Sequence, residues 1–216
     1  MNGNRKFVLR FTRLNRILHV FMIISFIILS LTGMSLKFSY TGWAKILSRF
    51  FGGFELAGYW HRFAALIMMI IFVIHLFDLV RVKRKEFGSW KKLLRGKHSM
   101  LFNKKDWQDF KASILWFIGK GDRPQYGRWT YWEKFDYFAV FWGMFVIGST
   151  GLTLWFSEFF TNFMPGWMLN VATIIHSDEA LLATGFIFTI HFDENKMMKV
   201  LLGWRRQIQY IDIRKY

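Results

Sequence analysis

The chain has 216 residues, of which 53% are apolar and 20% aromatic, and it contains no cysteine. The lack of cysteine excludes disulfides, thiolate metal sites, iron–sulfur clusters and covalent c-type haem attachment within this chain. The formal net charge of +16 would suggest nucleic acid in a soluble protein. Here the basic residues lie mostly between apolar segments, so membrane orientation explains them better, and we expect no nucleic-acid partner.

Four segments reach the length of about 20 apolar residues that a membrane-spanning helix needs. We expect these spans at about 17–36, 61–80, 135–156 and 167–192. The sequence thus predicts an all-α membrane protein, in which residues 1–216 form one bundle of four transmembrane helices. Within the long connection 81–134, "KKDWQDFKASILWFIGKG" predicts a short amphipathic helix on the inner membrane surface.

Lysine and arginine residues near the spans predict the orientation of the chain in the membrane. Five precede the first span, 14 lie in residues 81–128 and six lie in the C-terminal tail, whereas the loop 157–166 has none. We therefore expect both termini and the connection 81–134 to be cytoplasmic, and the short loops around 40–59 and 157–166 to face outside. This arrangement describes a multi-pass protein of the cell inner membrane.

Histidines mark both ends of the second and fourth spans, in "HRFAALIMMIIFVIH" and "HSDEALLATGFIFTIH". Both spans run from outside to inside, so His61 and His176 should lie at the outer ends, and His75 and His191 at the inner ends. His19, near the start of the first span, should also lie on the inner side. The paired histidines are 14 and 15 residues apart, which is roughly 21–23 Å along one face of a helix.

Five histidines sorted into two layers are chemically informative, although any single one could be an ordinary polar residue at the membrane interface. Ionisable side chains within a span are costly and usually functional. Imidazoles on facing helices are the usual means by which a helical bundle holds haem iron. Zinc needs three or four converging ligands, and the outer layer offers two histidines. The pattern therefore favours bis-histidine ligation of two non-covalently bound haems.

The four spans together resemble the four-helix membrane cytochrome b subunits of the formate dehydrogenase, thiosulfate reductase and hydrogenase type, which are dihaem quinone-reactive anchors. "RLNRILHVFMIISFIILSLTG" is similar to the first span of that family, with its histidine and closing Thr-Gly, and "GYWHRFAALIMMIIFVIHL" to the second. "YWEKFDYFAVFWGMFVIGSTGLTLWF" and "NVATIIHSDEALLATGFIFTIH" are similar to the third and fourth. The resemblance covers residues 10–192.

This resemblance implies the haem ligands. His61 and His176 match the positions that ligate the outer haem. For the inner haem, His19 and His191 match the formate dehydrogenase type, which leaves His75 as an additional histidine. Pairing His75 with His191, as in the cytochrome bc type, is also possible, and the sequence leaves both alternatives open.

Other residues within the spans allow two interpretations each. Glycine is unfavourable inside a helix, so close approach to a haem or to another helix would explain Gly33, Gly143, Gly148, Gly151 and Gly185. Asp178 and Glu179 follow His176 within the fourth span, where carboxylates are expensive. They would serve either in proton handling and tuning of the outer haem, or as hydrogen-bond partners of a neighbouring helix.

The resemblance implies a membrane electron-transfer subunit with two b haems, rather than a complete enzyme. It would pass electrons between an extracytoplasmic redox subunit, such as a multihaem cytochrome c or an iron–sulfur protein, and a quinone, menaquinone or ubiquinone, in the surrounding lipid. One alternative is a haem-free membrane anchor or proton-conducting subunit. Another is a standalone quinol-oxidising cytochrome that serves soluble acceptors.

Overall fold

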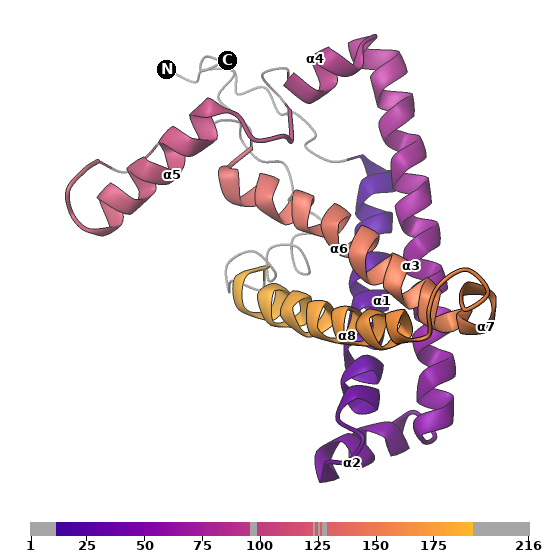
Figure 1. Cartoon of the computed structure of the whole chain (residues 1–216). Helices are drawn as coiled ribbons and strands as arrows, with labels where there is room; N and C mark the ends of the chain where they lie inside the picture. Colours follow the sequence, from indigo (N-terminus) through magenta and orange to yellow (C-terminus); the bar gives the residue numbers. More distant parts are fainter. Residues whose placement is uncertain (1–11, 96–98, 123, 125, 127–128, 192–216) are drawn as a thin grey trace. The chain divides into compact units, whose positions relative to one another are not determined.

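The computed structural model describes residues 12–95, 99–122, 124, 126 and 129–191, and in these ranges the regular secondary structure is helical (Figure 1). Within these residues four helices are long and apolar enough to cross a membrane: α1 (Arg13–Lys37), α3 (Phe54–Val82), α6 (Tyr131–Trp155) and α8 (Trp167–Phe186). This confirms the predicted all-α membrane class with four long apolar helices. The predicted end of the fourth span, at residue 192, lies outside the described residues.

Shorter helices connect these spans. They are α2 (Gly42–Phe50), α4 (Trp90–Arg95), α5 (Lys104–Phe117) and α7 (Ser157–Phe160). A π-helical turn, η1 (Lys83–Phe87), continues α3, and another, η2 (Ile187–His191), continues α8. Helix α5 confirms the amphipathic helix predicted in the long connection. Its location on the membrane surface stays a prediction, as does the orientation of the termini.

By its internal contacts the chain divides into two compact units, the first formed by Met1–Ile71 with Ser177–Tyr216. In this unit α1 packs against α8 through small polar residues. Ser30 Oγ of α1 and Thr184 Oγ1 of α8 form a buried hydrogen bond of 3.1 Å. Small polar side chains let membrane helices approach closely and form hydrogen bonds across the contact.

Helix α2 ends at a turn in which Gly52 has φ +87° and a Cβ atom would lie 2.5 Å from Leu56. Glycine is therefore required at this position.

The second unit is Phe72–His176 and contains the end of α3, α4 to α7 and the beginning of α8. Phe72 of α3 packs edge-on against Phe141 of α6, with ring centroids 5.2 Å apart. Helix α6 begins at Tyr131 because Thr130 caps it: Thr130 Oγ1 accepts from the Glu133 amide, and Glu133 Oε2 accepts from the Thr130 amide. Such a reciprocal box satisfies two backbone donors at the helix start.

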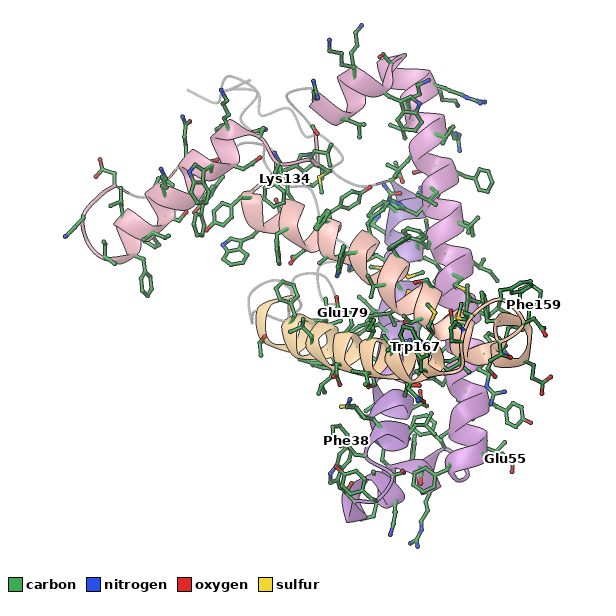
Figure 2. All side chains as sticks on the ribbon, viewed as in Figure 1. Phe38, Glu55, Lys134, Phe159, Trp167 and Glu179 are labelled. Atoms are coloured by element: carbon green, nitrogen blue, oxygen red, sulfur yellow. The ribbon has the colours of Figure 1, made fainter. Side chains whose placement is uncertain are left out.

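A buried ion pair joins α5 to α6 at that same helix start. Lys134 Nζ lies 2.8 Å from Asp106 Oδ2, and each side chain is 5% exposed. Lys134, labelled in Figure 2, also donates to the Leu101 carbonyl, while Asp106 closes the capping box of α5 by accepting from the Asn103 amide. The pair therefore ties the amphipathic helix to the third span.

Replacing Lys134 with methionine should destabilise this junction strongly. Removing one partner leaves the other buried and uncompensated, which costs about 3–5 kcal/mol. Thermal unfolding in detergent, together with protease cleavage between α5 and α6, measures the effect. Lys105→Met removes an exposed lysine from α5, next to Asp106, and should leave both readouts unchanged. Equal behaviour of the two variants would show that the pair does not hold the junction.

Candidate functional site

His61 lies on α3, in the first unit, and its ring is held by α1. Its Nδ1 atom is 3.0 Å from Thr32 Oγ1. The Thr32 hydroxyl donates its single proton to the Ile28 carbonyl oxygen at 2.6 Å, so it accepts the bond from His61 Nδ1–H. Neutral imidazole carries one proton, and this bond fixes it on Nδ1. Nε2 is then the nitrogen with the lone pair.

His176 lies on α8, in the second unit, and α6 holds its ring in the same way. Its Nδ1 atom is 3.0 Å from the Ile147 carbonyl oxygen and 3.3 Å from Thr150 Oγ1. A carbonyl only accepts, so the proton again lies on Nδ1. The Thr150 hydroxyl donates to the Val146 carbonyl oxygen at 2.7 Å and can accept a second, longer bond from the histidine.

A glycine follows each of these threonines and makes room for the histidine ring. A Cβ atom on Gly33 would lie 3.3 Å from His61 Cε1, and one on Gly151 would lie 2.9 Å from His176 Cε1. No such crowding exists at Gly148 or Gly185, where a Cβ atom would meet nothing within 4 Å. Close contact therefore explains two of the predicted glycines, and that contact is with a histidine ring.

Both histidines present the donor chemistry that an axial haem ligand needs. Metal-ligating histidines almost always donate the second ring N–H to a carbonyl or a similar acceptor, which fixes tautomer and ring orientation. His61 and His176 each do so through Nδ1. Among the residues that the structure describes, no three His, Cys, Asp or Glu side chains gather as a zinc site would require. The local geometry fits haem iron.

His75, also on α3, has a different environment. Its Nε2 atom lies 3.0 Å from the hydroxyl oxygen of Tyr137 on α6. The ring packs edge-on against Tyr137 and Phe141, with centroid distances of 5.8 and 6.0 Å. His61 and His176 form these hydrogen bonds through Nδ1, so Nε2 keeps the lone pair that could bind a metal. In His75 it is Nε2 that is hydrogen-bonded, to the hydroxyl group of Tyr137.

The two remaining predicted ligands are less fully described. His19 is half-buried on α1. His191 is the last residue of the π-helical turn η2, and its side chain lies outside the described residues. Short π-helical stretches within helices occur frequently at functional sites, and the position of His191 agrees with that tendency.

Asp178 forms a contact with a neighbouring helix, one of the two roles predicted for it. Lys37, at the end of α1, donates to Ser177 Oγ at 2.8 Å and pairs with Asp178 Oδ1. The Asp178 side chain is 63% exposed in the chain alone. The pair anchors the fourth span to the first within the first unit.

A family model described as "Prokaryotic cytochrome b561" matches residues 10–192, which is most of the chain. The chain belongs to the prokaryotic cytochrome b561 family. The match spans all five predicted haem ligands, from His19 to His191, and confirms the resemblance to membrane cytochrome b subunits. No curated protein matched the chain.

Membership of the cytochrome b561 family makes this chain a membrane electron-transfer protein and implies b-type haem as its cofactor. The sequence prediction overlooked Thr32 and Thr150 as partners of the histidines, and Tyr137 as the partner of His75. One signal was present: a Thr-Gly pair occurs in both the first and the third span, at 32–33 and 150–151.

Adding a methyl group at Gly151 should weaken haem binding in this cytochrome b561 homologue. In Gly151→Ala the new Cβ atom forces the His176 ring to move, and displaced support of a ligand typically costs about 10- to 100-fold in metal affinity. Gly33→Ala should act in the same direction but less, because its contact is longer. Haem per polypeptide after purification measures both. Gly148→Ala and Gly185→Ala are the controls and should match the wild type; a loss as large in them would refute the role of the ring contact.

Proposed function

We propose that this chain carries two b haems, one near each face of the membrane, and passes electrons between an extracytoplasmic redox subunit and the quinone pool. The observation that carries the proposal is that His61 and His176 each form an Nδ1 hydrogen bond to a neighbouring helix, to the Thr32 hydroxyl and to the Ile147 carbonyl oxygen respectively. Two histidines on different helices thus have the Nδ1 atom hydrogen-bonded and the proton placed there, as expected if both bind iron through Nε2.

For one haem, predicted to be the outer one, we propose His61 and His176 as axial ligands. For the other we propose His19 and His191. The bond between His75 Nε2 and the Tyr137 hydroxyl supports this second choice, because ligation through Nε2 would require His75 to give up that partner. His75 would then support the site rather than bind the iron.

Haem iron supplies a carrier of single electrons that alternates between the ferric and ferrous states. The protein supplies a fixed imidazole orientation and an apolar surround from its helices. Two carriers are needed because the hydrocarbon core is about 30 Å thick, too far for one transfer step. A quinol releases two electrons and two protons on oxidation, so the side at which quinone reacts also needs groups that exchange protons with water.

The partner subunit would be a multihaem cytochrome c or an iron–sulfur protein, and the quinone would be menaquinone or ubiquinone. The family membership supports a redox partner and a membrane location in general. The cell inner membrane is the location at which a quinone pool and an extracytoplasmic redox subunit would both be accessible.

Anaerobic mixing of the purified protein in lipid nanodiscs with menaquinol or ubiquinol tests this function. We expect at least one quinol to reduce the haems, seen as growth of the b-type α band, without added enzyme. Dithionite sets the fully reduced reference. Haems that respond to dithionite but to neither quinol would contradict quinone reactivity while leaving the cytochrome itself in place.

A further inference from the structure

The two histidines proposed for the outer haem are held by the same local sequence in two separate parts of the chain. Thr32-Gly33 of α1 holds His61 in the first unit, and Thr150-Gly151 of α6 holds His176 in the second. In each case the glycine lies against the ring edge and the threonine lies at Nδ1.

We propose that Thr32 and Thr150 are positioning residues for the two axial ligands, and that Thr32 contributes more to holding its histidine than Thr150 does. Thr32 is the acceptor that the structure shows for the His61 Nδ1–H bond, at 3.0 Å. Thr150 instead shares its histidine with the Ile147 carbonyl oxygen, which is the nearer acceptor at 3.0 against 3.3 Å. This inference rests on the proposed function, because it needs His61 and His176 to be ligands.

In both threonines a hydrogen bond within the helix orients the hydroxyl group so that its oxygen can accept a bond from the histidine. Each hydroxyl donates to a carbonyl oxygen four residues earlier, Ile28 for Thr32 at 2.6 Å and Val146 for Thr150 at 2.7 Å. This back-bonding uses the hydroxyl proton and leaves oxygen lone pairs for the histidine. Thr32 is fully buried, so its hydroxyl is shielded from water.

An acceptor at Nδ1 makes the imidazole a stronger electron donor to iron. A stronger donor stabilises ferric over ferrous haem and so lowers the midpoint potential. Thr32→Val removes the acceptor while keeping the side-chain shape. Thr150→Val leaves the Ile147 carbonyl in place, because that oxygen belongs to the backbone.

The test is a redox titration of both variants, followed in the b-type α band, with haem per polypeptide measured in parallel. For Thr32→Val we expect the midpoint potential of one haem to rise and the affinity for that haem to fall by about 10- to 100-fold, seen as lower haem per polypeptide, with the second haem unchanged. Thr150→Val should show a clearly smaller shift on that same haem. Thr32→Ser, which keeps the hydroxyl, should restore wild-type values.

Thr153→Val is the matched control, because Thr153 lies one turn further along α6 and donates to the Ser149 carbonyl of its own helix. It should match the wild type in both measurements. If Thr32→Val cannot be purified, Thr32→Cys replaces the hydroxyl with a weaker acceptor and should raise the potential in the same direction.

Equal shifts in the Thr32 and Thr150 variants, or wild-type potentials in both Thr32→Val and Thr32→Cys, would overturn the inference. His61→Ala, prepared alongside, separates this failure from that of the proposed function. Loss of a haem in His61→Ala with unchanged Thr32 variants would remove only the positioning role. Retention of every haem in His61→Ala would remove the ligand assignment on which that role depends.

Discussion

Replacing either His61 or His176 with alanine should remove one b haem and leave the other bound. The two side chains are proposed as the axial ligands of the same iron, and alanine offers no donor atom in their place. In both, Nδ1 is hydrogen-bonded to an acceptor on a neighbouring helix, so Nε2 is the atom that would bind the iron and that alanine lacks. The same haem should therefore be lost in both variants.

The pyridine haemochrome assay, referred to polypeptide concentration, measures this loss. We expect two haems per wild-type chain, about one in each single variant and about one in the double variant, because the two substitutions affect a single site. His98→Ala is a matched control, since His98 lies in the long connection 81–134, outside the two predicted histidine layers. Full haem content in either His61→Ala or His176→Ala would refute the pairing.

His19→Ala should remove the second haem, whereas His75→Ala should retain both. The reason is the hydrogen bond of 3.0 Å between His75 Nε2 and the Tyr137 hydroxyl, which occupies the nitrogen that the other ligands offer to iron. Loss of His75 would leave the Tyr137 hydroxyl without this partner. A buried unsatisfied hydroxyl costs about 1–3 kcal/mol, and Tyr137 is half-buried, so we expect a smaller loss of thermal stability and no loss of haem.

Haem content and thermal stability, measured on the same preparations, distinguish the two histidines. Tyr137→Phe breaks the same hydrogen bond without touching a histidine, so it should resemble His75→Ala in haem content. If His75→Ala loses a haem while His19→Ala keeps both, the ligand of the inner haem is His75, as in the cytochrome bc type. Loss of a haem in neither variant would remove both assignments.

The sequence predicted four long apolar helices well because hydropathy detects apolar runs directly, but the helices extend beyond the predicted apolar runs. The third span was predicted from residue 135, whereas α6 begins at Tyr131. The additional turn contains Glu133 and the charged Lys134, which hydropathy scores as outside the membrane. Lys134 is nevertheless helical and buried, because Asp106 from α5 compensates its charge.

The spacing of the histidines and the family resemblance together predicted the candidate ligands, but neither indicated the residues that support them. Thr32 and Thr150 look like ordinary small polar residues of membrane helices. Their role depends on which neighbouring helix faces them, and one sequence does not contain that information. The same holds for Asp178, for which the sequence left two roles open until the contact with Lys37 showed the helix-to-helix pair.

The number of haems per chain tests the account most directly. Purified wild-type protein should give reduced-minus-oxidised spectra with b-type bands, and a redox titration should resolve two components of equal amplitude that add up to two haems per polypeptide. A spectrum without b-type bands, or a titration that accounts for a single haem in fully loaded protein, would contradict the arrangement of two histidine-ligated haems proposed for this membrane cytochrome.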